Sequence, residues 1–292
     1  MADTIAAPRP QADRPARRTA RTRRRRGPLA YLLRAIVIVY LVMLVGWPVL
    51  MIVQHTFATG LAPVWEALTD PTVLFALRLT VFVSLAAVAL NTVFGVGISI
   101  LLVRYDFRGK RTLSALLDLP LSVSPIVVGL SLILVYGGRD GWFGPALESA
   151  GFQVIFAIPG MILATAFVSL PLVIREVVPI LQEIGTEQEQ AATSLGASAA
   201  QTFRRVTLPA IKWAVVYGLV LTLARSLGEF GAVKVVSGNF QNQTQTATLL
   251  VEEKYQDFQQ GAAYSVAFLL AAVSVACIIV VSFLRPDTSR QR

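Results

Sequence analysis

The sequence predicts an all-α integral membrane protein with six transmembrane helices and both termini in the cytoplasm. Of the 292 residues, 55% are strongly apolar and only 15% are charged, and the mean hydropathy is +0.64. Soluble domains carry charge on about a quarter of their residues, so this chain cannot cover a surface that faces water. Six apolar segments also have lengths near the ~20 residues that a helix needs to cross a bilayer.

The six predicted spans cover residues 32–53, 74–103, 113–136, 155–179, 213–236 and 261–284. The basic residues are concentrated on one side of these spans. Of the 26 Lys and Arg residues, 21 lie in the N-terminal tail, in the second and fourth loops with their flanks, and at the C-terminus. Because loops with an excess of Lys and Arg stay in the cytoplasm, both termini and the even-numbered loops are predicted to be cytoplasmic.

Small, polar and proline residues interrupt the apolar spans. Asn91, Gly95 and Gly97 in the second span are residues that let neighbouring helices approach closely. We expect four prolines to break the third and fourth spans: Pro120, Pro125, Pro159 and Pro171. Such breaks fit a polar pathway or simple kinks in a packed bundle, and the pattern alone does not choose between them.

The first 28 residues form a basic tail. They hold nine of the 22 arginines and four prolines, so we expect a disordered cytoplasmic segment. A basic arm could bind nucleic acid, but directly before a span it attracts membrane lipid and fixes topology, which is the interpretation we favour. The chain is then uncharged from Ala35 to Trp65, too long for a signal peptide with its ~7–15 apolar residues. The predicted domains are therefore the tail (1–28), a transmembrane domain (29–286) and a cytoplasmic C-terminal tail (287–292).

The scarcity of cysteine and histidine excludes several classes of protein. Cys277 is the only cysteine and His55 the only histidine, so an internal disulfide and a His/Cys metal cluster are ruled out. No segment fits the phosphate-binding pattern GxxxxGK[ST]. We expect no metal site, no catalytic residue and no cofactor bound by this chain, which is not itself an enzyme.

Arg225 and Glu229 are charged residues inside the fifth predicted span. Four residues apart, they share one face of a helix and can form an ion pair. Arg225 follows Trp213 by 12 residues, about 18 Å along a helix and near the middle of the bilayer. A charge there costs at least ~2.5–3.5 kcal/mol, so the pair should face the bundle interior or water. It fits a structural pair between helices or a polar element at a gate, and both interpretations stay open.

The fourth loop, about residues 182–212, carries the signals of two short helices. Thr186 with Glu189, and Ser198 with Gln201, are capping-box patterns that begin helices. Gly196 between them suits the left-handed residue that ends a helix. The pattern predicts a rigid elbow, which fits a docking element for another protein or an ordinary connector.

This elbow resembles the EAA loop of ABC-importer permeases, in which Glu-Ala-Ala precedes a glycine and a later Leu-Pro. Gln190 replaces the glutamate of that family, although Glu189 precedes it. The resemblance implies a type I ABC importer permease fold with a cytoplasmic coupling loop. The residues to which it assigns ATPase coupling are Gln190, Ala191, Ala192, Ser194, Leu195, Gly196, Ala197, Ser198, Leu208 and Pro209.

The resemblance extends over about residues 74–284 and narrows the substrate class. Segments 118–125, 141–145 and 159–160 are similar to the sulfate permease group. Segment 225–232 is typical of permeases for sulfate, molybdate and related oxyanions. The run 243–246, followed by Val251, Glu252 and Tyr255, resembles the W-type subunit of sulfate/thiosulfate importers, not the T-type subunit.

The resemblance implies a chain that forms half of a pore for ATP-driven uptake of sulfate or thiosulfate across the bacterial inner membrane. The implied partners are a T-type permease subunit, two ABC ATPase subunits that use ATP and Mg, and an extracytoplasmic sulfate-binding protein. A divalent anion needs weak donors along its path, because a tight site would trap it. We expect path or gate residues at Ser122, Ser124, Pro125, Arg225 and Glu229.

Two other functions compete with this interpretation. A molybdate or tungstate importer permease shares the 225–232 run and works as a homodimer. A secondary anion transporter or channel would run without ATP. The second is disfavoured because the six spans show no clear inverted repeat and the fourth loop has the character of a docking element.

Overall fold

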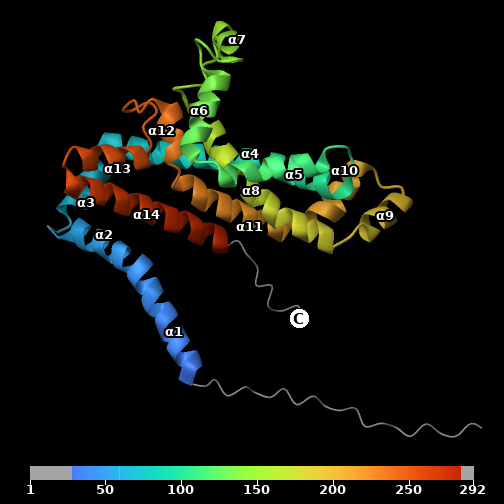
Figure 1. Ribbon diagram of the computed structural model, residues 1–292, viewed down its shortest axis with the longest axis horizontal. Coiled ribbons are helices and arrows are strands. Elements are labelled where there is room, and N and C mark those ends of the chain that lie inside the picture. The colour runs from blue at the N-terminus through green and yellow to red at the C-terminus, as the bar shows by residue number, and fades with distance from the viewer. Residues whose placement is uncertain (1–27, 59, 284–292) are drawn as a thin grey trace, which may run out of the picture. The chain divides into compact units, whose positions relative to one another are not determined.

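The computed structural model describes residues 28–58 and 60–283, and every regular element within these ranges is a helix (Figure 1). The predicted all-α fold class is thereby confirmed for the described ranges. The chain divides into two compact units, Met1–Val49 and Leu50–Arg292. The predicted C-terminal tail, residues 287–292, lies outside the described residues.

The first unit contains α1 (Pro28–Leu41), η1 (Val42–Gly46) and the first residues of α2 (Trp47–Phe57). η1 is a wide π-helical turn, in which the Trp47 N–H bonds to the Val42 carbonyl five residues back. The residues predicted for the first span, 32–53, are therefore helical throughout. Residues 1–27 of the predicted tail lie outside the described residues. Pro28, which the prediction included in that tail, begins α1, and proline is favoured at this first helical position.

The second unit holds the other helices. They are α3 (Ala62–Thr69), α4 (Pro71–Arg104), α5 (Lys110–Ser122), α6 (Pro125–Tyr136), α7 (Gly144–Ser149), α8 (Ile158–Glu183), α9 (Glu187–Ser194), α10 (Ala199–Thr202), η2 (Phe203–Thr207), α11 (Leu208–Leu227), α12 (Gly231–Ser237), α13 (Ala247–Gln256) and α14 (Gln260–Phe283). Figure 1 shows α4, α8, α11 and α14 side by side. In the described ranges, five helical stretches are long and apolar enough to cross a membrane, and α5 with α6 adds a sixth if the bent pair is one span.

Two predicted spans differ from the structure. The third, residues 113–136, is not one straight helix, because the chain bends by 117° between α5 and α6. Pro125 disfavours a helical conformation at the residue before it, and Ser124 is accordingly extended (φ −59°, ψ 135°). The fifth, residues 213–236, also ends early: α11 stops at Leu227 and α12 is a separate helix.

Of the four prolines expected to break spans, only Pro125 lies at a break. Pro120 is inside α5, and Pro159 is in the first turn of α8, where its missing N–H is tolerated. Pro171 is buried inside α8, which runs unbroken for 26 residues. The predicted break in the fourth span was therefore wrong, because packed neighbours hold a membrane helix together around one lost backbone bond.

Small and polar residues bring α4 against α8. The Asn91 Nδ2 donates to the Ala166 carbonyl (3.0 Å) and to the Ser169 Oγ (2.8 Å), and both bonds are buried. A Cβ added at Gly95 would lie 2.9 Å from the Val173 Cβ, whereas one at Gly97 would meet nothing within 4 Å. The predicted role in close helix contact is confirmed for Asn91 and Gly95, and it was wrong for Gly97, which faces away.

We expect Gly95→Ala to destabilise the fold and Gly97→Ala to leave it unchanged or more stable. Both substitutions gain the same helix propensity, up to ~1 kcal/mol. Only the first drives a methyl group into Val173, at a cost of about 1–3 kcal/mol. Thermal unfolding of the two variants in one detergent measures the difference. Equal midpoints would contradict the close contact between α4 and α8.

The breaks in the two interrupted spans lie next to each other. A Cβ added at Gly231, the first residue of α12, would be 3.1 Å from the Pro125 Cβ. One turn further along α6, a Cβ at Gly129 would be 2.7 Å from the Val235 Cβ. The start of α6 therefore packs on α12, and the α5–α6 break lies beside the α11–α12 break.

Candidate functional site

The predicted elbow is formed by α9 and α10. Gly196 between them has φ +86°, the left-handed conformation expected at the end of a helix. Ser198 and Gln201 form the predicted capping box: the Gln201 N–H donates to the Ser198 Oγ (3.3 Å), and the Ser198 N–H donates to the Gln201 Oε1 (2.9 Å). Local sequence thus fixes the turn and the start of the second helix.

Two details of the elbow differ from the prediction. Thr186 precedes α9 but makes no capping bond to the backbone, and its hydroxyl accepts a hydrogen bond from the Gln190 Nε2 instead (3.1 Å). The second helix is also not short, because α10 continues through η2 into α11 as one apolar stretch. Pro209 is the second residue of α11, in its first turn after the π turn of η2, so its missing N–H is accommodated without ending the helix.

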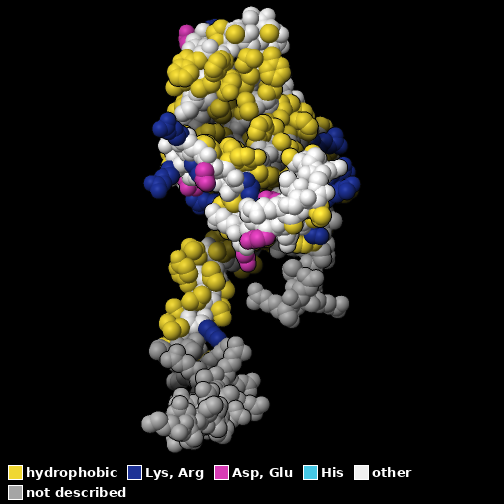
Figure 2. Space-filling model, turned by 90° about the vertical axis from the view of Figure 1, so that its right-hand side faces the viewer, with side chains coloured by type: hydrophobic (Ala, Val, Ile, Leu, Met, Phe, Trp, Pro, Cys, Tyr) yellow, Lys and Arg dark blue, Asp and Glu magenta, His cyan; other side chains and the backbone are white. Residues whose placement is uncertain are grey.

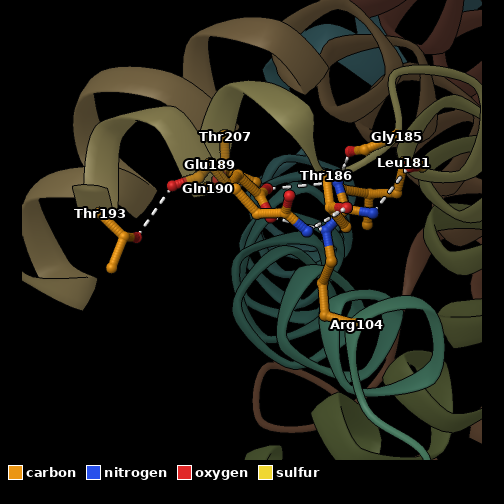
Figure 3. Close-up of polar contacts among 8 residues, drawn as sticks. All are labelled: Arg104, Leu181, Gly185, Thr186, Glu189, Gln190, Thr193 and Thr207. Carbon is orange, nitrogen blue, oxygen red and sulfur yellow. Dashed lines mark hydrogen bonds and ion pairs between the residues drawn. The ribbon is translucent and has the colours of Figure 1, made fainter. Parts of the chain in front are cut away.

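Arg104, the last residue of α4, ties the elbow to the bundle (Figure 3). Its guanidinium donates to the carbonyls of Leu181 (3.0 Å) and Gly185 (2.8 Å), at the end of α8. Its Nε lies 2.8 Å from the Glu189 Oε2, and the other oxygen of Glu189 accepts from the Thr207 Oγ1 (2.7 Å). The Arg104 and Glu189 side chains are only 11% and 19% exposed. A largely buried ion pair therefore joins α4, α8, α9 and η2.

The residues assigned to coupling lie on the outer side of this junction. Gln190, Ala191, Ser194, Leu195, Gly196, Ser198 and Pro209 are exposed, and Ala192, Ala197 and Leu208 are half-buried. Leu195 is 89% exposed. The elbow therefore presents an apolar tip on a backbone that the Arg104–Glu189 pair holds in place.

Basic side chains surround this end of the second unit. Figure 2 looks onto the end that carries α9 and α10, where Lys and Arg side chains gather; Arg108, Arg111, Arg204 and Arg205 are all exposed. In the α4–α5 loop, the Lys110 Nζ donates to the Asp106 Oδ1 (2.9 Å). This hydrogen bond and the charge of Lys110 hold the pKa of Asp106 below its usual value. The carboxylate therefore stays ionised at neutral pH within a basic surface.

Arg225 and Glu229 form the predicted ion pair, with 2.6 Å between Nη1 and Oε2. The helix ends between them at Leu227, so the expected continuous helical face was wrong, and the pair instead spans the turn after α11. Glu229 is 3% exposed, accepts from the Ala232 N–H (3.1 Å) at the start of α12, and its carbonyl accepts from the Thr248 Oγ1 (3.0 Å). The Arg225 side chain remains 40% exposed. Glu229 therefore caps α12 and partly neutralises a guanidinium that solvent can reach.

The other predicted path residues lie at the α5–α6 break. Ser122 ends α5, Ser124 precedes α6 and Pro125 begins it. Both serines are exposed, and Pro125 is half-buried. Since Pro125 lies against Gly231, the structure brings these residues near the segment that contains Glu229. The five predicted path residues thus occupy two adjacent breaks.

The run 243–246, on which the W-type resemblance rests, holds a loop together. The Thr244 Oγ1 donates to the Ser237 carbonyl (2.6 Å), and the Gln245 amide donates to the Glu253 carboxylate. Both side chains are buried. These residues fix the connection between α12 and α13.

Among the ion pairs that the sequence analysis did not predict, two join residues that lie far apart in the sequence. One is the pair of Arg104 and Glu189. The only sequence signal for this pair was a basic residue at the end of a long apolar helix and an acidic residue in the elbow. The other is Arg175 with Asp118, with 2.9 Å between Nη2 and Oδ1. Its signal was stronger, because Asp118 is the only acidic residue of the third predicted span and Arg175 lies inside the fourth.

The arrangement of helices matches that of solved ABC importers. A bacterial transporter involved in the import of the acidic polysaccharide alginate superposes with a TM-score of 0.73, covering 88% of this chain and 94% of that chain at 14% identity. The alginate ABC transporter in complex with its alginate-bound periplasmic protein gives a TM-score of 0.75, covering 90% and 95% of the two chains at 14% identity. The fold is that of an ABC importer membrane subunit.

The chain belongs to the binding-protein-dependent transport system inner membrane component family, which matches residues 92–290. It is 46% identical to the sulfate transport system permease protein CysW of Synechococcus elongatus, over 90% of this chain and 91% of that protein. CysW of Escherichia coli K12 is 43% identical over 82% and 81%. The CysT permease of Synechococcus elongatus is 38% identical over 86% and 90%. This chain is accordingly a multi-pass membrane protein.

Proposed function

We propose that this chain is the W-type permease subunit of an ATP-driven sulfate/thiosulfate importer and forms half of its pore. The observation that carries the proposal is the 43–46% identity to CysW permeases over at least 82% of the chain. Identity to the T-type relative is lower, at 38%. In this assembly the chain pairs with a T-type permease subunit, and an extracytoplasmic binding protein delivers the anion.

The elbow is the docking element for the ATPase subunits, and it lies on the cytoplasmic side. The concentration of Lys and Arg at this end of the second unit supports that orientation. The chain holds no phosphate-binding loop, so two partner ATPases use the ATP and Mg. Their closure pushes the exposed residues around Leu195, and the Arg104–Glu189 junction passes the movement to α4, α8 and α11.

We expect Arg225→Ala to lower sulfate uptake more than it lowers assembly of the complex. The half-exposed guanidinium provides a positive potential that attracts the anion, and the charge of Glu229 weakens this potential. A weaker attraction suits a conduction path, because the anion must also be released from it. Uptake and the yield of purified complex should be measured on the same preparations. A complex that fails to assemble, while its residual fraction transports normally, would make the pair purely structural.

The direct test is reconstitution of the chain with a T-type subunit, its ATPase and the sulfate-binding protein in proteoliposomes. We expect sulfate or thiosulfate to be taken up only when ATP is present on the side of the membrane where the ATPase subunits lie. Molybdate should be a poor substrate. Molybdate uptake in the absence of a second permease type would support the oxyanion homodimer instead. Sulfate uptake without ATP would point to a secondary transporter.

A further inference from the structure

α5 carries a polar face along its length. Arg111, Ser114, Asp118 and Ser122 follow each other at intervals of three or four residues, so they share one side of the helix, and all four are exposed. Leu116 lies on the opposite side and is 54% exposed. Because α5 belongs to a bent helix pair that is apolar enough to cross a membrane, a continuous polar face on it requires an explanation.

α8 adds a charge to this face. Arg175 Nη2 lies 2.9 Å from the Asp118 Oδ1, and the two side chains are 59% and 57% exposed. Beside the pair, Ser114 and Leu117 of α5 and Ile174 of α8 line a groove of about 250 Å³. Arg175 is eight residues from the end of α8, which places it about 12 Å inside the helix.

Lipid is a poor environment for such a pair. Charges within membrane helices are costly and face the bundle interior or a water-filled cavity. A more than half-exposed pair is not enclosed by the chain's own helices, so its open side must face water or another protein. Ser114 and Ser122 favour water, since they continue the polar face on both sides of Asp118 and Ser122 carries it to the break at Ser124.

We infer that the polar face of α5 lines the aqueous anion path and that Arg175 is the cationic binding group of this path, with Asp118 as its counter-ion. The inference rests on the proposed function and adds a site that lies apart from Arg225. A guanidinium presents several N–H donors in a planar fork that fits the oxygens of a tetrahedral oxyanion. Asp118 competes for these donors, so the anion is held weakly enough to be released, as conduction requires.

Thiol labelling tests whether the polar face of α5 is accessible to water. Cys277 is the only cysteine, so Cys277→Ser gives a background in which single cysteines can be introduced. In the assembled complex, Ser114→Cys and Ser122→Cys should react with a membrane-impermeant, anionic methanethiosulfonate at least about tenfold faster than the matched control Leu116→Cys. Equal rates at the three positions, or no reaction at the two serine positions, would overturn the inference. This readout needs an assembled complex but no transport.

A set of three variants tests Arg175 itself. We expect Arg175→Gln, alone or with Asp118→Asn, to lower sulfate uptake by about tenfold or more, while assembly and binding-protein-stimulated ATP hydrolysis persist. Asp118→Asn alone should retain more uptake than either, because the guanidinium remains. If both single variants are equally impaired and the double variant recovers, the pair only joins helices and Arg175 is no anion site. A wild-type complex without ATP-dependent uptake would refute the proposed function, and the labelling rates would still decide the α5 face.

Discussion

Leu195→Glu is expected to abolish transport by preventing the ATPase subunits from docking. Leu195 is the most exposed large apolar side chain among the described residues of the elbow, at 89%. Burial of a fully exposed leucine side chain in a protein interface is worth about 1.5–3 kcal/mol. A carboxylate there would also be buried without a partner. The amount of ATPase that copurifies with the chain, and its ATP hydrolysis, measure the loss.

Leu195→Met is the matched control, because it keeps an apolar side chain of similar volume. It should retain ATPase binding and uptake. Both variants should reach the membrane in wild-type amounts, since the substituted residue contacts little of its own chain. Full ATPase binding by the glutamate variant would show that the elbow is a connector and not a docking element.

Glu189→Gln and Arg104→Gln are expected to loosen the elbow from the helix bundle. Each leaves the opposite charge of a largely buried pair without its partner, at a cost of about 1–3 kcal/mol. Glu189→Gln also weakens the bond that holds Thr207. We expect a lower thermal unfolding midpoint and, in the assembled complex, ATP hydrolysis that no longer drives proportionate uptake.

The neighbouring Lys110–Asp106 pair supplies the control. Its Asp106 side chain is 99% exposed, and exposed pairs contribute only about 0–1 kcal/mol. Lys110→Gln should therefore change neither the unfolding midpoint nor the number of anions carried per ATP. If Glu189→Gln behaves like Lys110→Gln, the Arg104–Glu189 pair does not transmit movement from the elbow to α4.

Local sequence patterns predicted the elbow well where they depend on one residue or on close neighbours. Gly196 adopts its left-handed conformation, and Ser198 caps α10 through Gln201, because both interactions lie within four residues along the chain. The Thr186 cap failed because Glu189, its intended partner, is taken by Arg104, 85 residues away in sequence. The spacing of residues within the loop carries no information about a contact with a residue so far away in the sequence.

The interruptions of the spans were likewise predictable where they depend on neighbouring residues and not where they depend on packing between helices. Pro125 produces a break because it disfavours a helical conformation at Ser124, the residue before it. Pro171 produces no break, since packing against other helices supports the chain around it. The spacing of Arg225 and Glu229 predicted their pairing but not the end of α11 at Leu227, because a paired Glu229 can equally cap a new helix. The Asp118–Arg175 contact joins helices 57 residues apart in sequence, beyond any local pattern.

The most direct test of the account is native mass spectrometry of the complex purified through this chain in mild detergent. We predict one copy of this chain, one copy of a different permease chain and two ATPase subunits. Two copies of this chain with the ATPases would contradict the W-type assignment and favour an oxyanion homodimer. A chain that purifies without any ATPase would contradict the claim that the elbow couples this membrane subunit to ATP hydrolysis.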